Sequence, residues 1–198
     1  MSPSLKRRCG LALSMMCVTA QATNQIPDPN FDVGNVSHWG QFGIGSYVDF
    51  DATRNIQGAA GSGSLLMTNF IGGSVGSNGV ALCLQGTYFP GIYTYGAWLY
   101  VASGQSLRAA GVGLDFYQSG NCSGGAIVGG SGNLSPTPTS FDTWTLSTQT
   151  FNLLSIAFSA RIYLYGGNAG KTLKVNFDGV RFGFPGTTPV TLQSFGVD

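Results

Sequence analysis

Hydrophobic positions in this sequence recur mostly with a period of two, in short runs that are interrupted by turn residues. No long window shows apolar residues at helical spacing without an intervening glycine. Clusters of Gly, Ser, Asn and Pro separate the runs and supply turn conformations. The pattern predicts eight or nine strands, at Ser46–Phe50, Ser64–Asn69, Val80–Gln85, Ile92–Val101, Ala110–Gln118, Thr143–Phe151, Ala157–Tyr165, Leu173–Phe182 and Val190–Phe195.

So many antiparallel strands in a chain of this length indicate an all-β fold, a two-sheet antiparallel β-sandwich of jelly-roll type. We expect this single domain to occupy residues 23–183. The Pro-rich stretch Leu134–Thr139 is expected to be an exposed loop. Residues 184–198 are expected to form a short Pro/Gly linker and a strand-like tail.

Alternation within the predicted strands separates core positions from outward positions. Tyr93, Tyr95, Ala97, Leu99 and Val101 share one face and are expected in the core. The outward positions carry rings and charges where Thr, Ser and Lys are more usual. They are Trp98, Tyr100, Asp115, Tyr117, Arg161, Tyr163 and Tyr165. An outward face of this composition requires an explanation.

The first 22 residues have the features of a secretory signal peptide. Lys6, Arg7 and Arg8 precede the apolar stretch Cys9–Ala20, and Ala20-Gln21-Ala22 fits a small-x-small cleavage site. A lipoprotein site at Cys17 is disfavoured because the residue before it is not small. A membrane anchor is disfavoured because no second apolar run follows. We therefore expect a secreted protein, extracellular, periplasmic or on the cell surface, with no membrane span.

Cleavage would change both the charge and the cysteine count. Six basic residues would remain against eight aspartates, a net charge of −2, which argues against a nucleic-acid binder. Cys83 and Cys122 would remain, and an even pair in an exported chain indicates a disulfide. The alternative, two free thiols, is disfavoured in an oxidising compartment.

Several short motifs together resemble the carbohydrate-binding modules of families four, nine and twenty-two, in the galactose-binding-domain-like superfamily. They are the opening Pro29–Gly34 followed by Trp39, the glycine-rich turn Gly58–Gly63 leading into Ser64–Met67, the tyrosine-led Gly91–Trp98 and the closing Phe177–Phe182. Cys83, the Asn121–Gly124 segment and Ser159–Arg161 look like a variant of secreted bacterial relatives.

The resemblance implies a structural calcium ion between the first and last strands. By position, Asn30 would supply a backbone carbonyl, and Asp32 and Asp178 would supply carboxylates. Carbonyls near Gly58–Gly61 would complete an oxygen-only ligand set. The alternative is that Asp32 and Asp178 cap turns.

The resemblance also implies a glycan bound on one sheet face, because sugar C–H faces pack on aromatic rings and hydroxyls need polar partners. The seven outward residues supply both. The alternatives are that these rings pack under loops, or that the domain is a cell-surface structural or protein-interaction unit. In that second case the C-terminal strand could pair with another chain or a second copy.

Enzyme motifs are weak. Gly72–Gly76 matches the G-x-S-x-G pattern of serine hydrolases around Ser74, but without its strand-to-helix context. His38, the one histidine and so the one candidate base, lies in the entry loop beside Trp39. With no glutamate, nothing singles out a glycosidase carboxylate pair. We therefore expect a non-catalytic protein.

Overall fold

A computed structural model describes residues 24–58, 60–71, 78–105, 110–128, 135–167 and 172–183. The predicted signal peptide, the Gly72–Gly76 motif and the predicted strand Val190–Phe195 lie outside these ranges, as does any pairing of that strand with another chain. Among the described residues, no helix is long and apolar enough to cross a membrane.

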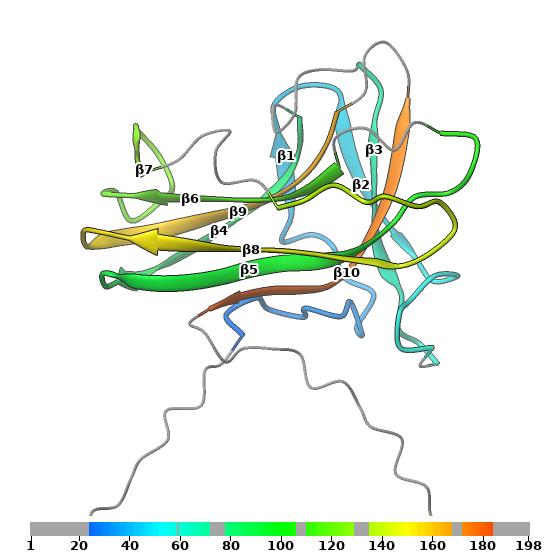
Figure 1. Ribbon diagram of the computed structural model, residues 1–198, viewed down its shortest axis with the longest axis horizontal. Coiled ribbons are helices and arrows are strands. Elements are labelled where there is room, and N and C mark those ends of the chain that lie inside the picture. The colour runs from blue at the N-terminus through cyan, green and yellow to red at the C-terminus, as the bar shows by residue number, and fades with distance from the viewer. Residues whose placement is uncertain are drawn as a thin grey trace, which may run out of the picture.

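The described chain is an all-β sandwich of two antiparallel five-stranded sheets (Figure 1). Sheet A has the order β1-β4-β9-β6-β7 and sheet B the order β2-β3-β10-β5-β8. The strand bounds are β1 Gly40–Phe42, β2 Ser46–Asp51, β3 Ser64–Asn69, β4 Gly79–Tyr88, β5 Gly91–Tyr100, β6 Ala110–Tyr117, β7 Ala126–Val128, β8 Thr145–Leu153, β9 Ala157–Gly166 and β10 Leu173–Gly183.

The strands predicted within the described ranges are all present, with bounds that differ by a few residues. Two strands were not predicted, β1 and β7. Each has three residues, which is too short for period-two alternation to stand out. The short strands lie at the edges of sheet A, where one neighbour suffices to hold them.

The core lies between the two sheets and is lined by the inward positions that alternation predicts. Tyr93, Tyr95, Ala97 and Leu99 of β5 are fully buried. Trp39 of the opening motif is also buried, at 4% exposure. A cluster of buried rings including Tyr93, Phe116 and Phe182 fills one end, with centroids 5.1–6.1 Å apart. Ring packing of this kind adds to the area term of burial.

Two tyrosine rings of β9 cover two glycines on the outer face of β6. In the antiparallel register, Gly111 lies opposite Tyr165 and Gly113 opposite Tyr163. A Cβ atom built on Gly113 would overlap the Tyr163 ring, and one on Gly111 would overlap Tyr165. The rings therefore lie against the strand backbone and replace the side chains that glycine lacks.

We predict that Gly113→Ala lowers the free energy of unfolding by about 1–3 kcal/mol, because the new methyl group displaces the Tyr163 ring. The measurement is chemical denaturation of the variant and the wild type. Gly120→Ala is the matched control, since a Cβ there meets no atom within 4 Å. Equal stability of the two variants would show that the ring moves aside at no cost.

Candidate functional site

The seven outward residues predicted from sequence do not form one surface. Asp115 and Tyr117 on β6 and the three residues of β9 belong to sheet A, whereas Trp98 and Tyr100 on β5 belong to sheet B. The single binding face is thus corrected to two faces on opposite sides of the sandwich. Alternation tells which side of its own sheet a residue occupies, but it does not tell which sheet the strand joins.

On the outer face of sheet A, Arg161 is surrounded by acid and aromatic rings. Its Nη2 lies 2.5 Å from Asp115 Oδ2, and the Tyr117 hydroxyl donates to the same oxygen at 3.3 Å. The guanidinium carbon lies 4.7 Å from the Phe42 ring centroid and 5.1 Å from that of Tyr117. The guanidinium is thus paired with one carboxylate and packed against two rings, while its buried Nε has no hydrogen-bond partner among the described residues.

The tyrosines of this face are packed rather than open. Tyr117, Tyr163 and Tyr165 are only 2%, 3% and 1% exposed. Burial raises the pKa of Tyr165 to about 12, so its hydroxyl stays protonated, and it donates to the Ser135 carbonyl at 3.1 Å. Rings with so little exposed surface do not offer a platform on which a sugar could stack.

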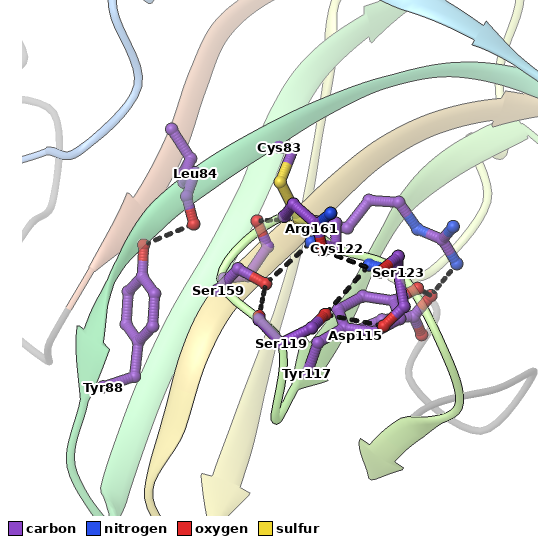
Figure 2. The surroundings of a disulfide bond; sticks show 12 residues. Cys83, Leu84, Tyr88, Asp115, Tyr117, Ser119, Cys122, Ser123, Ser159 and Arg161 are labelled. Carbon is purple, nitrogen blue, oxygen red and sulfur yellow. Dashed lines mark hydrogen bonds and ion pairs between the residues drawn. A yellow bond between two sulfur atoms is a disulfide. The ribbon is translucent and has the colours of Figure 1, made fainter.

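A disulfide-linked loop covers another part of the outer face of sheet A. Cys83 of β4 is bonded to Cys122, as the sequence predicts (Figure 2). Cys122 N donates to Ser159 Oγ at 2.9 Å, and Ser159 Oγ donates to the Ser119 carbonyl at 2.5 Å. Ser159 is fully buried under this loop. The loop therefore covers part of the face instead of leaving a groove open.

Sheet B presents its aromatic residues differently. Trp98 and Tyr100 are half-buried on its outer face, and Trp144, just before β8, is half-buried beside them. The rings of Tyr100 and Trp144 lie 5.6 Å apart at 56°. Trp98 packs over the β10 bulge, where a Cβ on Gly179 would lie 3.0 Å from its Cδ1 atom. All three rings keep part of their surface in contact with solvent.

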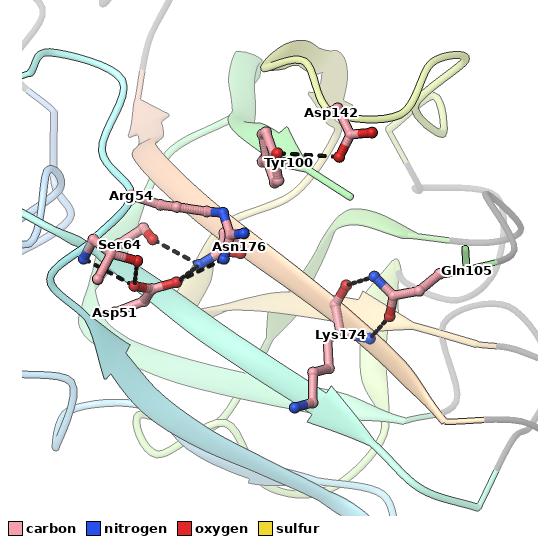
Figure 3. Close-up of polar contacts among 9 residues, drawn as sticks. Asp51, Arg54, Ser64, Tyr100, Gln105, Asp142, Lys174 and Asn176 are labelled. Carbon is pink, nitrogen blue, oxygen red and sulfur yellow. Dashed lines mark hydrogen bonds and ion pairs between the residues drawn. The ribbon is translucent and has the colours of Figure 1, made fainter. Parts of the chain in front are cut away.

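Polar groups surround Tyr100 on this face (Figure 3). The Arg54 guanidinium carbon lies 5.0 Å from the Tyr100 ring centroid, and Arg54 Nη1 lies 3.2 Å from Asp51 Oδ2. Asn176 Nδ2 donates to the same Asp51 oxygen at 2.9 Å. The Tyr100 hydroxyl donates to Asp142 Oδ1 at 3.2 Å. We call Arg54, Tyr100, Asp142 and Trp144 the Tyr100 cluster.

Hydrogen bonds favour the ionised form of the two carboxylates near Tyr100. Backbone and side-chain hydrogen bonds from Ser103 hold the pKa of Asp142 below its usual range, although Asp142 is fully exposed. Burial alone would raise the pKa of Asp51, but hydrogen bonds from Thr53, Asn176 and Arg54 outweigh it and lower that pKa. Both carboxylates are therefore ionised at neutral pH, next to one arginine.

The residues expected to hold calcium meet where the first turn contacts β10. Asp178 is 1% exposed, and its oxygens accept from Ile56 N at 2.8 Å and Gly179 N at 2.7 Å, so it caps these turns. The Asn30 carbonyl accepts from Ser62 Oγ at 3.2 Å, and Asp32 is exposed. Within the described ranges, no group of three acidic, histidine or cysteine side chains is placed to hold a metal ion.

Asp178 is nevertheless electrostatically unusual. Burial raises its pKa to about 6, against its two backbone hydrogen bonds, and the nearby carboxylates of Asp32 and Asp28 raise it further. Asp28 was not singled out from sequence; its carboxylate accepts from Asp32 N at 2.8 Å and so shapes the turn. The donors here, carboxylates and a backbone carbonyl, are all oxygens, the ligand type that calcium prefers.

Sequence reasoning also missed Arg54, Phe42 and the role of Trp144. Arg54 follows β2, and Phe42 ends a strand that was not predicted. Trp144 lies within the predicted strand Thr143–Phe151, but the pairing that brings this strand beside Tyr100 is a long-range property that alternation does not show.

No protein-family model matches the sequence, and no curated protein does. Solved structures do match the fold. The CBM22-1 xylan-binding domain of Xyn10C from Paenibacillus barcinonensis aligns with a TM-score of 0.54 and 16% identity, over 78% of this chain and 90% of that domain. The CBM22-1–GH10 modules of Xyn10B from Clostridium thermocellum, complexed with xylohexaose, align with a TM-score of 0.50 and 16% identity. The alignment covers 81% of this chain and 28% of that chain.

A third match is the enzymatically active domain of tailspike protein 4 from bacteriophage CBA120, with a TM-score of 0.57 and 12% identity. The alignment covers 81% of this chain and 21% of the tailspike chain, so this chain spans about a fifth of the tailspike's length. At these identities the likeness concerns the fold. The chain has the β-sandwich fold of carbohydrate-binding modules.

Proposed function

We propose that this protein is an exported, non-catalytic module that binds a neutral glycan at the Tyr100 cluster. The observation that carries the proposal is the contrast between the two outer faces. Tyr163 and Tyr165 of sheet A are 3% and 1% exposed, whereas Tyr100 and Trp144 of sheet B keep accessible ring surface beside polar groups. Sugar binding needs both elements, ring faces for C–H groups and donors or acceptors for hydroxyls.

The cluster supplies donors and acceptors on fixed supports. Arg54, with 41% of its side chain exposed, is held by Asp51, and Asp142 is held by Ser103 and Tyr100. Arg54 and the two ionised carboxylates, Asp51 and Asp142, leave one net negative charge, which disfavours an anionic ligand and supplies acceptors for sugar hydroxyls. The fold of xylan-binding and other carbohydrate-binding modules supports the same class of ligand. The serine-hydrolase motif lies outside the described residues and adds no support for catalysis.

We predict that Trp144→Ala and Tyr100→Ala each weaken glycan binding roughly tenfold, the equivalent of about 1.4 kcal/mol, because each removes a ring on which a sugar packs. The measurement is affinity electrophoresis on soluble xylan, β-glucan and galactan, followed by calorimetry with whichever polysaccharide retards the wild type.

Phe89→Ala is the matched control, since Phe89 is an exposed ring (59%) away from the cluster. Circular dichroism verifies that each variant is folded. Binding that survives both cluster substitutions but is lost in Arg161→Ala would assign the glycan to sheet A and contradict the placement. Retardation of the wild type by none of a broad polysaccharide panel would contradict the function itself.

We further propose that Asp178, with Asp32 and the Asn30 carbonyl, holds a structural calcium ion. The support is electrostatic: burial raises the pKa of Asp178 to about 6, with a further contribution from its acidic neighbours, and a bound cation would favour the ionised form. Bound calcium would join the first turn to the last strand and stabilise the fold; it has no part in holding the glycan.

Without calcium, Asp178 binds its proton more tightly in the folded protein than in the unfolded chain. We therefore predict that, in a chelator, the free energy of unfolding falls as pH rises from about 4 to about 6, by up to about 3 kcal/mol. Asp178→Asn should flatten this profile, whereas Asp49→Asn, at an exposed site, should not. Calcium at pH 7 should raise the unfolding temperature of the wild type only; equal stabilisation of Asp178→Asn would remove Asp178 as a ligand.

A further inference from the structure

A second pair of exposed rings lies on the same outer face of sheet B as the Tyr100 cluster. Tyr47 of β2 and Phe70, directly after β3, stack with centroids 4.9 Å apart at 30°. They are 45% and 51% exposed. We call them the Tyr47 pair. Stacked rings left open to solvent on a strand face are costly unless they serve contact with another molecule.

The strand order fixes how the two aromatic groups are related. Tyr47 pairs with Thr68 of β3, Thr68 pairs with Lys174 of β10, and Asn176 of β10 pairs with Tyr100 of β5. The Tyr47 pair and the Tyr100 cluster are thus three strand spacings and one two-residue step apart, roughly 16 Å at about 4.8 Å per strand and 3.4 Å per residue. A disaccharide does not reach across this distance, but a longer oligosaccharide does.

The surface between the two groups is mostly polar, and its accessible groups flank the direct path, where Thr68 and Asn176 are 0% and 4% exposed. Lys174 and Asp49 are exposed, and Arg54 reaches across Asn176 between β2 and Tyr100 (Figure 3). Gln105 fixes the start of β10, since it accepts from Lys174 N at 2.7 Å and donates to the Lys174 carbonyl at 3.2 Å. These groups offer hydrogen-bond donors and acceptors along the path while the ring groups mark its ends.

We propose that the outer face of sheet B binds a linear oligosaccharide laid across β5, β10, β3 and β2, with the Tyr100 cluster at one end and the Tyr47 pair at the other. This rests on the proposed function and adds a substrate class: an extended chain, rather than a single sugar or a chain terminus. The Tyr47 pair serves as a distal subsite that short ligands do not reach.

The length of the oligosaccharide is the variable that tests this proposal. Affinity is measured by calorimetry for β-1,4-linked xylo-, gluco- and galacto-oligosaccharides from the disaccharide to the hexasaccharide. For the wild type we expect affinity to rise at least about tenfold along the series that binds. In Tyr47→Ala and Phe70→Ala the rise should disappear while disaccharide affinity stays unchanged, and Phe89→Ala, at an exposed ring elsewhere, should keep the wild-type rise.

The outcomes separate this inference from the proposed function. Loss of affinity at every length in Trp144→Ala, with an unchanged rise in Tyr47→Ala, would overturn the distal subsite and leave the function standing. Full affinity at every length in Trp144→Ala and Tyr100→Ala would overturn the function. The exposed Ile44 (66%) and Ile71 (58%) lie near the pair, so sedimentation must be measured too. Self-association that Phe70→Ala abolishes would make the pair a protein contact and overturn the subsite.

Discussion

The pairing of β6 with β9 decides what each face of this sandwich can do. In that register Arg161 lies opposite Asp115, Tyr163 opposite Gly113 and Tyr165 opposite Gly111. Each of these three outward side chains of β9 thus meets either an opposite charge or a glycine. A slip by one residue would send the tyrosines inward and expose Ile162 and Leu164, so the buried side and the outer side enforce the same alignment.

Because those partners satisfy one another, sheet A has little left to offer a ligand. Its rings are covered, its arginine is paired, and the Cys83–Cys122 bridge holds a loop over Ser159. On the outer face of sheet B, Trp98 also packs against a glycine, Gly179, but Tyr100 contacts Trp144 and Arg54, and both rings remain only half-buried. Similar composition on two faces therefore leads to a structural surface on one and an accessible surface on the other.

The sequence predicted the fold well because its signals are local. Period-two alternation located the strands and the core positions of β5, and the even pair of cysteines in the predicted mature chain indicated the disulfide. The candidate site was predicted only in part. Alternation identified Trp98 and Tyr163 as outward, yet whether two strands share a sheet depends on long-range pairing, and whether a ring is open depends on what packs over it. Arg54 and Trp144 enter the site through such contacts alone.

The packing of tyrosine rings against glycines on sheet A also limits which substitutions this protein can accept during evolution. A side chain at position 113 costs stability unless the ring at position 163 becomes smaller, so the effects of substitutions at the two positions are coupled. The exposed rings of sheet B carry no such partner requirement, and one can be exchanged for another residue without disturbing the strands beneath. Substitutions on the proposed binding face are therefore less constrained by strand packing than substitutions on the outer face of sheet A.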